Sequence, residues 1–251
     1  MTVRMDASAR PAAIEARGLR FRWSAEGRTL LDIPALEIAR GERVFIHGPS
    51  GSGKSTLLSL FGGVLLPEQG EIAVLGRSLG GLSASRRDAL RADHLGFIFQ
   101  QFNLIPYLDV QGNVTLPCRF SRLRQARARA RGGIEAEAQR LLQQLGLGDA
   151  ALAHRRPDEL SVGQQQRVAA ARALIGAPEI LIADEPTSAL DADRKEAFLE
   201  LLLAECTALD TTLVFVSHDT ALAGVFDRAI ALAEINRAPA GDSTDPLAEA
   251  V

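Results

Sequence analysis

Short runs of apolar residues divide the first part of this chain into strands and one helix. Between Ala12 and Arg40, stretches such as GLRF and LLDIPALEI alternate with charged turns, a pattern typical of antiparallel strands. Arg43–His47 is a further strand candidate. It runs through a glycine-rich loop into Thr56–Phe61, whose apolar spacing predicts a helix. We therefore expect an antiparallel β entry followed by strand, loop and helix.

The middle of the chain is predicted to be helical and its end to be mixed. From Ser83 to Leu160 apolar residues recur at three- and four-residue spacing, which predicts an inserted helical subdomain over about residues 84–160. A later helix candidate, Ala192–Leu209, lies among apolar strands. The strand candidates are Glu179–Ala183, Thr212–Ser217 and Ala229–Ala233. Strand, helix and strand in this order predict a parallel sheet.

Composition limits the class of protein. The chain has 251 residues, 47% hydrophobic and 24% charged, which is typical of a globular protein and excludes a fully disordered or collagen-like chain. With 28 basic and 31 acidic residues the net charge is −3, which argues against a general binder of nucleic acids or anionic membranes. Cys118 and Cys206 stand far apart without a CxxC pair, so neither a disulfide framework nor a cysteine zinc site is supported.

No segment is predicted to cross a membrane. Asp6 and Arg10 stand where a secretory signal needs apolar residues, and no run approaches the roughly 18 apolar residues of a membrane span. We therefore expect a cytoplasmic protein. Residues 1–11 are expected to be a loose N-terminal tail and the Pro- and Ala-rich residues 238–251 a flexible C-terminal tail, which leaves 12–237 as the folded domain.

One basic run, Arg119–Arg131, lies inside the predicted helical region. A solvated helix face is the favoured interpretation, and a contact surface for lipid headgroups or for a partner is the alternative. The two differ in whether the arginines face solvent or a docked surface.

The segment between the first predicted parallel strand and its helix carries candidate phosphate-binding chemistry. It reads GPSGSGKST, fits GxxxxGK[ST], and has the strand–loop–helix context that this motif needs. Its backbone N–H groups can converge on phosphate oxygens, Lys54 can reach the β- and γ-phosphates, and Ser55 can ligate Mg²⁺. Lys54 and Lys195 are the only lysines, and the chain otherwise uses arginine for its positive charges. A lysine at this motif position therefore stands out from the composition. The predicted nucleotide contacts are Gly48, Pro49, Ser50, Gly51, Ser52, Gly53, Lys54, Ser55 and Thr56.

Two later strands end in side chains that suit hydrolysis. Asp184 and Glu185 follow a buried strand candidate, at the edge where open α/β sheets bind ligands. Asp184 can hold Mg²⁺, directly or through water, and Glu185 can orient or deprotonate the water that attacks a γ-phosphate. His218 follows the next strand and can polarise a phosphate or that water. Glu185 and His218 are the predicted catalytic residues; an exposed strand-end carboxylate and a surface histidine cap are the alternatives.

These residues together resemble the nucleotide-binding subunit of an ATP-binding cassette (ABC) transporter over about residues 12–237. The most specific segment is Leu160–Arg167, LSVGQQQR, which is similar to the family signature LSGGQxQR and precedes the helix candidate Val168–Ile175. The resemblance implies an α/β fold: a P-loop NTPase with a RecA-like parallel core sheet, an antiparallel β subdomain and an inserted helical subdomain. It also implies a Mg²⁺-dependent ATPase with ATP and Mg²⁺ as cofactors.

The same resemblance implies a composite nucleotide site. In this family the signature of one subunit closes over ATP held by the phosphate loop of another, so Ser161, Gly163 and Gln164 would contact the partner's nucleotide. Asp191 matches the loop that signals across the dimer. Val162 stands where the family usually has a glycine and adds a β-branched side chain beside the partner's ATP.

Two further contacts follow from the resemblance. Gln100 is assigned to Mg²⁺ and water, as the family's Q-loop glutamine, with Gln101 as the rival. Trp23 falls where the family stacks an aromatic ring on adenine.

The stretch GFIFQQFNLIPYLDVQGNVTLP is similar to the branch whose partners are FtsX-like or macrolide-exporter-like membrane permeases. We therefore expect a homodimer that drives a separately encoded permease from the inner face of the cell membrane, with no nucleic-acid partner. The alternatives are a soluble regulatory cassette that acts on ribosomes or DNA and a small-molecule kinase or GTPase. Soluble cassettes of that kind usually duplicate the cassette or carry a long coiled-coil insertion, and a kinase or GTPase would lack LSVGQ.

Overall fold

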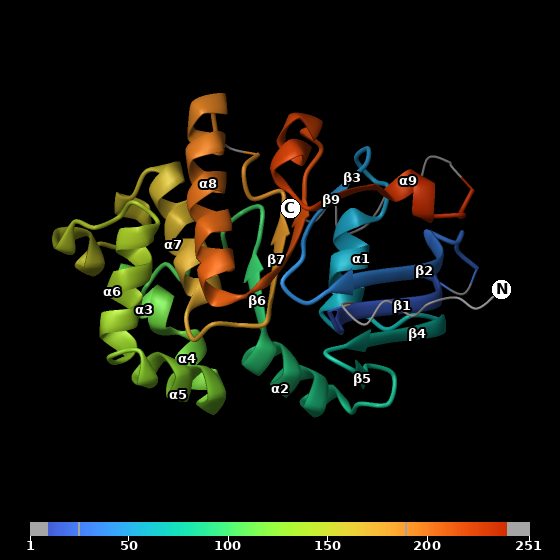
Figure 1. Ribbon diagram of the computed structural model, residues 1–251, viewed down its shortest axis with the longest axis horizontal. Helices are drawn as coiled ribbons and strands as arrows, with labels where there is room; N and C mark the ends of the chain where they lie inside the picture. The colour runs from blue at the N-terminus through green and yellow to red at the C-terminus, as the bar shows by residue number, and fades with distance from the viewer. Residues whose placement is uncertain (1–9, 25, 189, 240–251) are drawn as a thin grey trace.

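The computed structural model describes residues 10–24, 26–188 and 190–239, so most of the two predicted tails, 1–11 and 238–251, lies outside the described residues. An antiparallel sheet with the strand order β2-β1-β4-β5 forms one end of the molecule (Figure 1). Its strands are β1 (Ala12–Phe21), β2 (Leu31–Ala39), β4 (Gln69–Val74) and β5 (Arg77–Ser78). The predicted β entry is thus a true antiparallel pair, β1 with β2, joined by β4 along the other edge of β1.

A second sheet is wholly parallel and has the strand order β6-β7-β8-β3-β9. Its strands are β3 (Arg43–His47), β6 (Leu95–Ile98), β7 (Ile180–Asp184), β8 (Thr212–Val216) and β9 (Arg228–Ala231). The pairing puts Ile98 beside Ala183, Asp184 beside Val216, and Val216 beside Ile46. Four strands that are distant in sequence therefore end at one edge of the sheet.

Helices cover both faces of the parallel sheet and form the end of the molecule opposite the antiparallel sheet (Figure 1). The α-helices are α1 (Lys54–Phe61), α2 (Ala84–His94), α3 (Val110–Thr115), α4 (Pro117–Phe120), α5 (Arg122–Ala130), α6 (Ile134–Gln144), α7 (Val162–Leu174), α8 (Ala192–Leu209) and α9 (Leu232–Ile235). Short 3₁₀ turns are η1 (Ala150–His154), η2 (Pro157–Glu159) and η3 (Thr220–Val225). Among the described residues, no helix has the length and apolarity that a membrane span requires.

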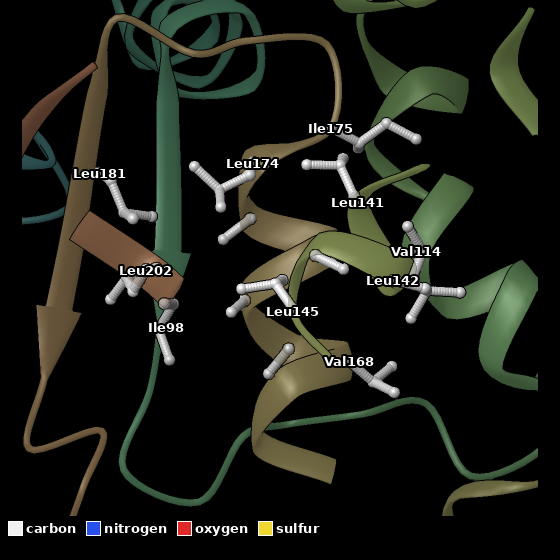
Figure 2. Close-up of a cluster of buried hydrophobic side chains, with 14 of the residues drawn as sticks. Ile98, Val114, Leu141, Leu142, Leu145, Val168, Leu174, Ile175, Leu181 and Leu202 are labelled. Carbon is white, nitrogen blue, oxygen red and sulfur yellow. The ribbon is translucent and has the colours of Figure 1, made fainter. Parts of the chain in front are cut away.

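Alternate residues of the parallel strands supply two separate cores, as the two-residue period of a strand requires. Leu181 and Phe215 pack with α3, α6, α7 and α8, a cluster of which Figure 2 shows a part. Ile182 and Val214 pack on the other face with α1, β1 and β2. The helix that follows the phosphate-binding segment, α1, and the helix that follows the LSVGQ segment, α7, therefore lie on opposite faces of one sheet.

One strand interrupts the region from which we expected only helices. The interpretation of about 84–160 as one helical insertion is wrong for β6, which pairs with β7 in the core sheet. β6 has only four residues, too few for strand periodicity to stand out in the sequence. The helices without an intervening strand, α3 to α6, begin at Val110.

The arginines of the basic run, residues 119–131, have different environments, which neither interpretation predicted. Arg119, Arg122, Arg129 and Arg131 are exposed, as a solvated face requires. Arg124, in contrast, is 1% exposed, and it donates hydrogen bonds to the carbonyls of Leu95, Ala173 and Ile175. Arg127 pairs with Glu179. Residues 124 and 127 share a helix face because they are three apart, and that face packs inward.

Candidate active site

The candidate residues meet at the carboxyl edge of the parallel sheet. Gly48 follows β3, Gln100 lies just beyond β6, Asp184 and Glu185 end β7, and His218 comes soon after β8. Because these strands are parallel neighbours, their ends converge, and ligands of such sheets bind at this edge. The structure thus brings together the strand-end residues that the sequence pointed to.

The phosphate-binding segment is a tight loop that opens into α1. Gly51 and Gly53 have φ angles of 73° and 95°, a left-handed conformation that glycine adopts without strain. A Cβ on Gly53 would lie 3.0 Å from Leu31 Cδ2, so the loop also lies close against β2. Lys54 is 8% exposed, and its Nζ donates to the carbonyl oxygens of Gly48 and Pro49, both at 2.9 Å. The ammonium group is therefore held within the loop. When a nucleotide binds, its phosphate oxygens can replace these carbonyl oxygens as acceptors.

The residues of this loop and of β7 fit a nucleotide with its magnesium ion. Ser52 Oγ is buried without a hydrogen-bond partner in the described part of the chain, as an atom that serves a ligand would be. Ser55 and Asp184 both line one cavity of about 660 Å³. A hydroxyl and a carboxylate are the hard oxygen donors that Mg²⁺ prefers. Among the described residues, no group of three or more His, Cys, Asp or Glu side chains could hold a metal.

Glu185 and His218 contact one another across β7 and β8. His218 Nδ1 lies 2.9 Å from Glu185 Oε2. Glu185 has a left-handed φ of 45°, and its N–H donates to the carbonyl of Val216 at 2.9 Å. A left-handed φ is strained for a residue with a side chain, and such strain is concentrated at functional sites. This geometry fixes the carboxylate at the sheet edge.

The signature segment begins α7. Ser161 is the N-cap: its Oγ accepts from the N–H of Gln164 at 3.3 Å, and Gln164 Oε1 accepts from the N–H of Ser161 at 2.9 Å. The helix therefore starts with a capping box. Val162 is 47% exposed, and a Cβ on Gly163 would lie 3.8 Å from Leu190 Cδ2. A helix start carries partial positive charge, so this end of α7 is suited to bind an anion.

Other predicted contacts lie at the margins of this site. Gln100 and Gln101 are both exposed in the turn after β6, so the choice of Gln100 stays a prediction. The carboxylate of Asp191 caps α8 by accepting from the N–H of Arg194 at 3.0 Å. Trp23 is 38% exposed, and its ring centroid lies 5.2 Å from that of Phe21 in an edge-to-face contact. Its ring is therefore open to a ligand.

Sequence reasoning missed the polar side chains that connect these parts. Gln166 is fully buried and donates to the carbonyl of Pro186 at 2.7 Å, while Arg172 donates to the carbonyls of Phe102 and Asn103. The signal in the sequence was weak: Gln166 lies in a polar run of glutamines at the start of α7, and Arg172 is the one charged residue of the apolar segment Val168–Leu174. Lys195 pairs with Asp219 at 2.9 Å, and this pair lowers the pKa of the Asp219 carboxyl.

The fold and this edge of the sheet define a P-loop NTPase. A family model described as "ABC transporter" matches residues 31–188. The chain belongs to the ABC transporter family and is an ATP-binding cassette of it, as the resemblance implied.

Relatives of known name agree with this assignment. The macrolide export ATP-binding/permease protein MacB of Chromobacterium violaceum is 40% identical over 248 residues, which cover 95% of this chain and 37% of MacB. The ABC transporter ATP-binding protein YbbA of Escherichia coli K12 is 43% identical over 197 residues, 78% of this chain and 83% of YbbA. The chain thus spans about a third of the length of the MacB proteins and most of that of YbbA.

Solved structures support the same fold. A dimeric post-hydrolysis state of the ATP-binding cassette MJ0796 bound to ADP and Pi superposes with a TM-score of 0.75 at 36% identity, covering 87% of this chain and 93% of that one. The structure of cbiO1 from Clostridium perfringens, part of the transporter complex cbiONQ, gives a TM-score of 0.71 at 28% identity over 83% of this chain and 79% of that one.

Proposed function

We propose that this chain is the ATP-hydrolysing, energy-coupling subunit of an ABC transporter: it dimerises on ATP and drives a membrane permease. The observation that carries the proposal is the position of α1 and α7 on opposite faces of the parallel sheet. A nucleotide held by Lys54 lies at the start of α1, so the start of α7 at Ser161 serves a nucleotide on a second copy. The MJ0796 cassette is a dimer with ADP and Pi, which supports this arrangement.

In the site closed by a second copy, each of the candidate residues has a distinct role. The loop N–H groups and Lys54 bind the β- and γ-phosphates, while Ser55, Asp184 and Gln100 would hold Mg²⁺. Mg²⁺, when bound, neutralises charge that develops on the phosphate oxygens. Glu185 accepts a proton from the attacking water, and His218 orients Glu185 through their 2.9 Å contact. Trp23 would stack on adenine, and Asp191 would face the second copy across the dimer.

The permease is proposed to dock on the groove between α2, β6 and α4. The cavity of about 660 Å³ reaches from Ser55 and Asp184 to the exposed side chains of Val64 and Phe120. Its walls are largely apolar, as a protein-binding groove requires. A segment bound there would lie next to the turn that carries Gln100. The MacB relatives are ATP-binding/permease proteins, which supports a permease of the macrolide-exporter or FtsX-like kind as partner.

We further propose that the chain acts on the inner face of the cell membrane through this permease. The net charge of −3 gives no general attraction to nucleic acids. A regulatory ABC-type ATPase without a permease is the alternative, and it would not need the apolar groove.

Phosphate release by the purified wild type and by Glu185→Gln, with size-exclusion chromatography in ATP and Mg²⁺, tests the proposal. We expect the variant to lose at least about 99% of hydrolysis and to elute as an ATP-bound dimer, because only the proton acceptor is removed. A wild type that binds ATP but neither hydrolyses it nor dimerises, even with candidate permeases in membranes, would overturn the proposal. Hydrolysis and dimerisation without recruitment to those membranes would favour the regulatory alternative.

A further inference from the structure

The turn that carries Gln100 has an unusual backbone. Phe102 and Asn103 have left-handed φ angles of 58° and 48°, which residues with a side chain rarely adopt. The N–H of Phe102 donates to the carbonyl of Phe99 at 3.0 Å, and that of Asn103 to the carbonyl of Gln101 at 2.6 Å. Gln100 therefore lies within a turn whose shape depends on two strained neighbours.

Arg172 of α7 holds the carbonyl groups of those same two residues. Its Nη1 donates to Asn103 O at 2.6 Å and its Nη2 to Phe102 O at 2.5 Å, and the residue is 9% exposed. Burial lowers the pKa of the Arg172 guanidinium, and no carboxylate in the described part of the chain forms an ion pair with it. Because an unpaired buried cation is costly, these two carbonyls must stay in place to satisfy it.

The helix that bears Arg172 also touches two other parts of the site. Ser161 caps its start, and Gln166 donates to the carbonyl of Pro186, directly after Glu185. Ser161 and Arg172 are eleven residues apart, about 16 Å along a helix. One helix, α7, thus begins in the signature segment and also contacts the segment after Glu185 and the turn around Gln100.

We propose that Arg172 is a positioning residue that couples Gln100 to the signature segment. When Ser161 docks on the nucleotide of a second copy, α7 carries the carbonyls of Phe102 and Asn103 with it, and Gln100 is held towards Mg²⁺. The inference rests on the proposed function and adds to it a physical link between the two halves of the composite site. Arg172 itself touches neither nucleotide nor metal in this scheme.

A double-mutant cycle in the Glu185→Gln chain tests this coupling. The measured quantity is the Mg²⁺ concentration that gives half of the ATP-driven dimer in size-exclusion chromatography. Arg172→Lys keeps the charge but loses the fork that spans two carbonyls. We expect Arg172→Lys and Gln100→Ala each to raise the Mg²⁺ midpoint about tenfold, and the double variant to raise it no further. Additive effects, in variants that keep the thermal midpoint of the parent chain, would overturn the proposal.

Arg124→Lys is the matched control. Arg124 is more deeply buried than Arg172, 1% against 9% exposed, and donates to three backbone carbonyls, of Leu95, Ala173 and Ile175, but it has no bond to the turn. Its replacement should leave the Mg²⁺ midpoint unchanged and should be additive with Gln100→Ala. An equal shift in Arg172→Lys and Arg124→Lys would mean that both arginines only support the fold.

A second variant loosens the turn without altering α7. Asn103 is exposed, and Asn103→Gly removes the constraint of a side chain at its left-handed φ. We expect it to raise the Mg²⁺ midpoint as well and to be non-additive with Gln100→Ala, whether or not Arg172→Lys folds. If Glu185→Gln bound ATP without dimerising, the proposed function would fail. The same cycle, read from the Mg²⁺-dependent fluorescence of bound mant-ATP, would then still decide the role of Arg172.

Discussion

Nδ1 of His218 lies 2.9 Å from Oε2 of Glu185, although 33 residues separate the two in the chain. The contact arises because β7 and β8 are parallel neighbours and each delivers its side chain at the same edge. The Glu185 side chain is 12% exposed, whereas that of His218 is 66% exposed. A largely buried carboxylate is thus oriented by an imidazole that remains open to water and ligand.

Replacement of His218 should reduce hydrolysis more than nucleotide binding. His218→Ala removes the group that orients Glu185, and we expect kcat to fall by about 10²-fold with KM for ATP changed little. Phosphate release at varied ATP concentration measures both constants. His154→Ala is the control, because His154 is exposed on η1, away from the strand ends. A fall in kcat that is equal in the two variants would contradict an orienting role.

The two lysines of the chain allow a matched test of the phosphate loop. Lys54 is enclosed by the carbonyls of Gly48 and Pro49, and a planar guanidinium is too large for that position. Lys54→Arg should weaken ATP binding by about 10²-fold, measured by fluorescence titration with mant-ATP. Lys195→Arg should bind ATP as the wild type does, since an arginine can keep the ion pair with Asp219. Equal affinities of the two variants would contradict this role of Lys54.

Val162 is expected to slow turnover. Its side chain is 47% exposed in the first turn of α7, between Ser161 and Gly163, where a second copy's nucleotide would approach the N–H groups. Val162→Gly removes this bulk, and we expect kcat for ATP hydrolysis to rise about threefold, since the anion can approach more closely in the transition state. Val225→Gly, at an exposed valine outside the site, is the control. An unchanged or lower kcat in Val162→Gly would show that the valine does not slow ATP hydrolysis.

Strong periodicity made several elements predictable. β3 (Arg43–His47) and α8 (Ala192–Leu209) have the bounds that the sequence indicated, because each has an uninterrupted apolar pattern next to a clear start or stop signal. β6 was not predicted, since four residues cannot reveal a period and its neighbours on both sides are helical. Tertiary pairing with β7, rather than local propensity, makes this segment a strand.

The strand-end residues of the site were predictable and the residues that connect them were not. Glu185 and His218 follow apolar strands, and parallel strands bring such ends together. Gln166 and Arg172 bind backbone carbonyls of segments distant in the sequence, so no side-chain motif marks their partners. The one visible signal is Arg172 as the single charged residue of the apolar segment Val168–Leu174, since Gln166 lies among other polar residues at the start of α7.

Glu179 anchors the helical region to the core sheet. Its carboxylate accepts from Arg127 of α5 at 2.6 Å and lies 3.0 Å from Nδ1 of His94 at the end of α2. Burial alone would raise the pKa of Glu179, but the hydrogen bonds from His94 and Arg127 lower it from 4.5 to about 2. The folded state therefore binds fewer protons at this group than the unfolded state does between pH 4.5 and 2.

This shift predicts an acid-dependent loss of stability. Because the folded pKa of Glu179 is depressed, its contribution is complete above about pH 4.5 and is lost as pH falls towards 2. Glu179→Gln should lower the free energy of unfolding by about 2 kcal/mol at pH 7, and by progressively less as pH falls through this window. Urea unfolding followed by circular dichroism measures both. Glu200→Gln, at an exposed position of α8, should leave the free energy of unfolding within about 0.5 kcal/mol of wild type. A Glu179→Gln deficit that stays constant from pH 7 to pH 2.5 would contradict the assigned role of the ionised carboxylate.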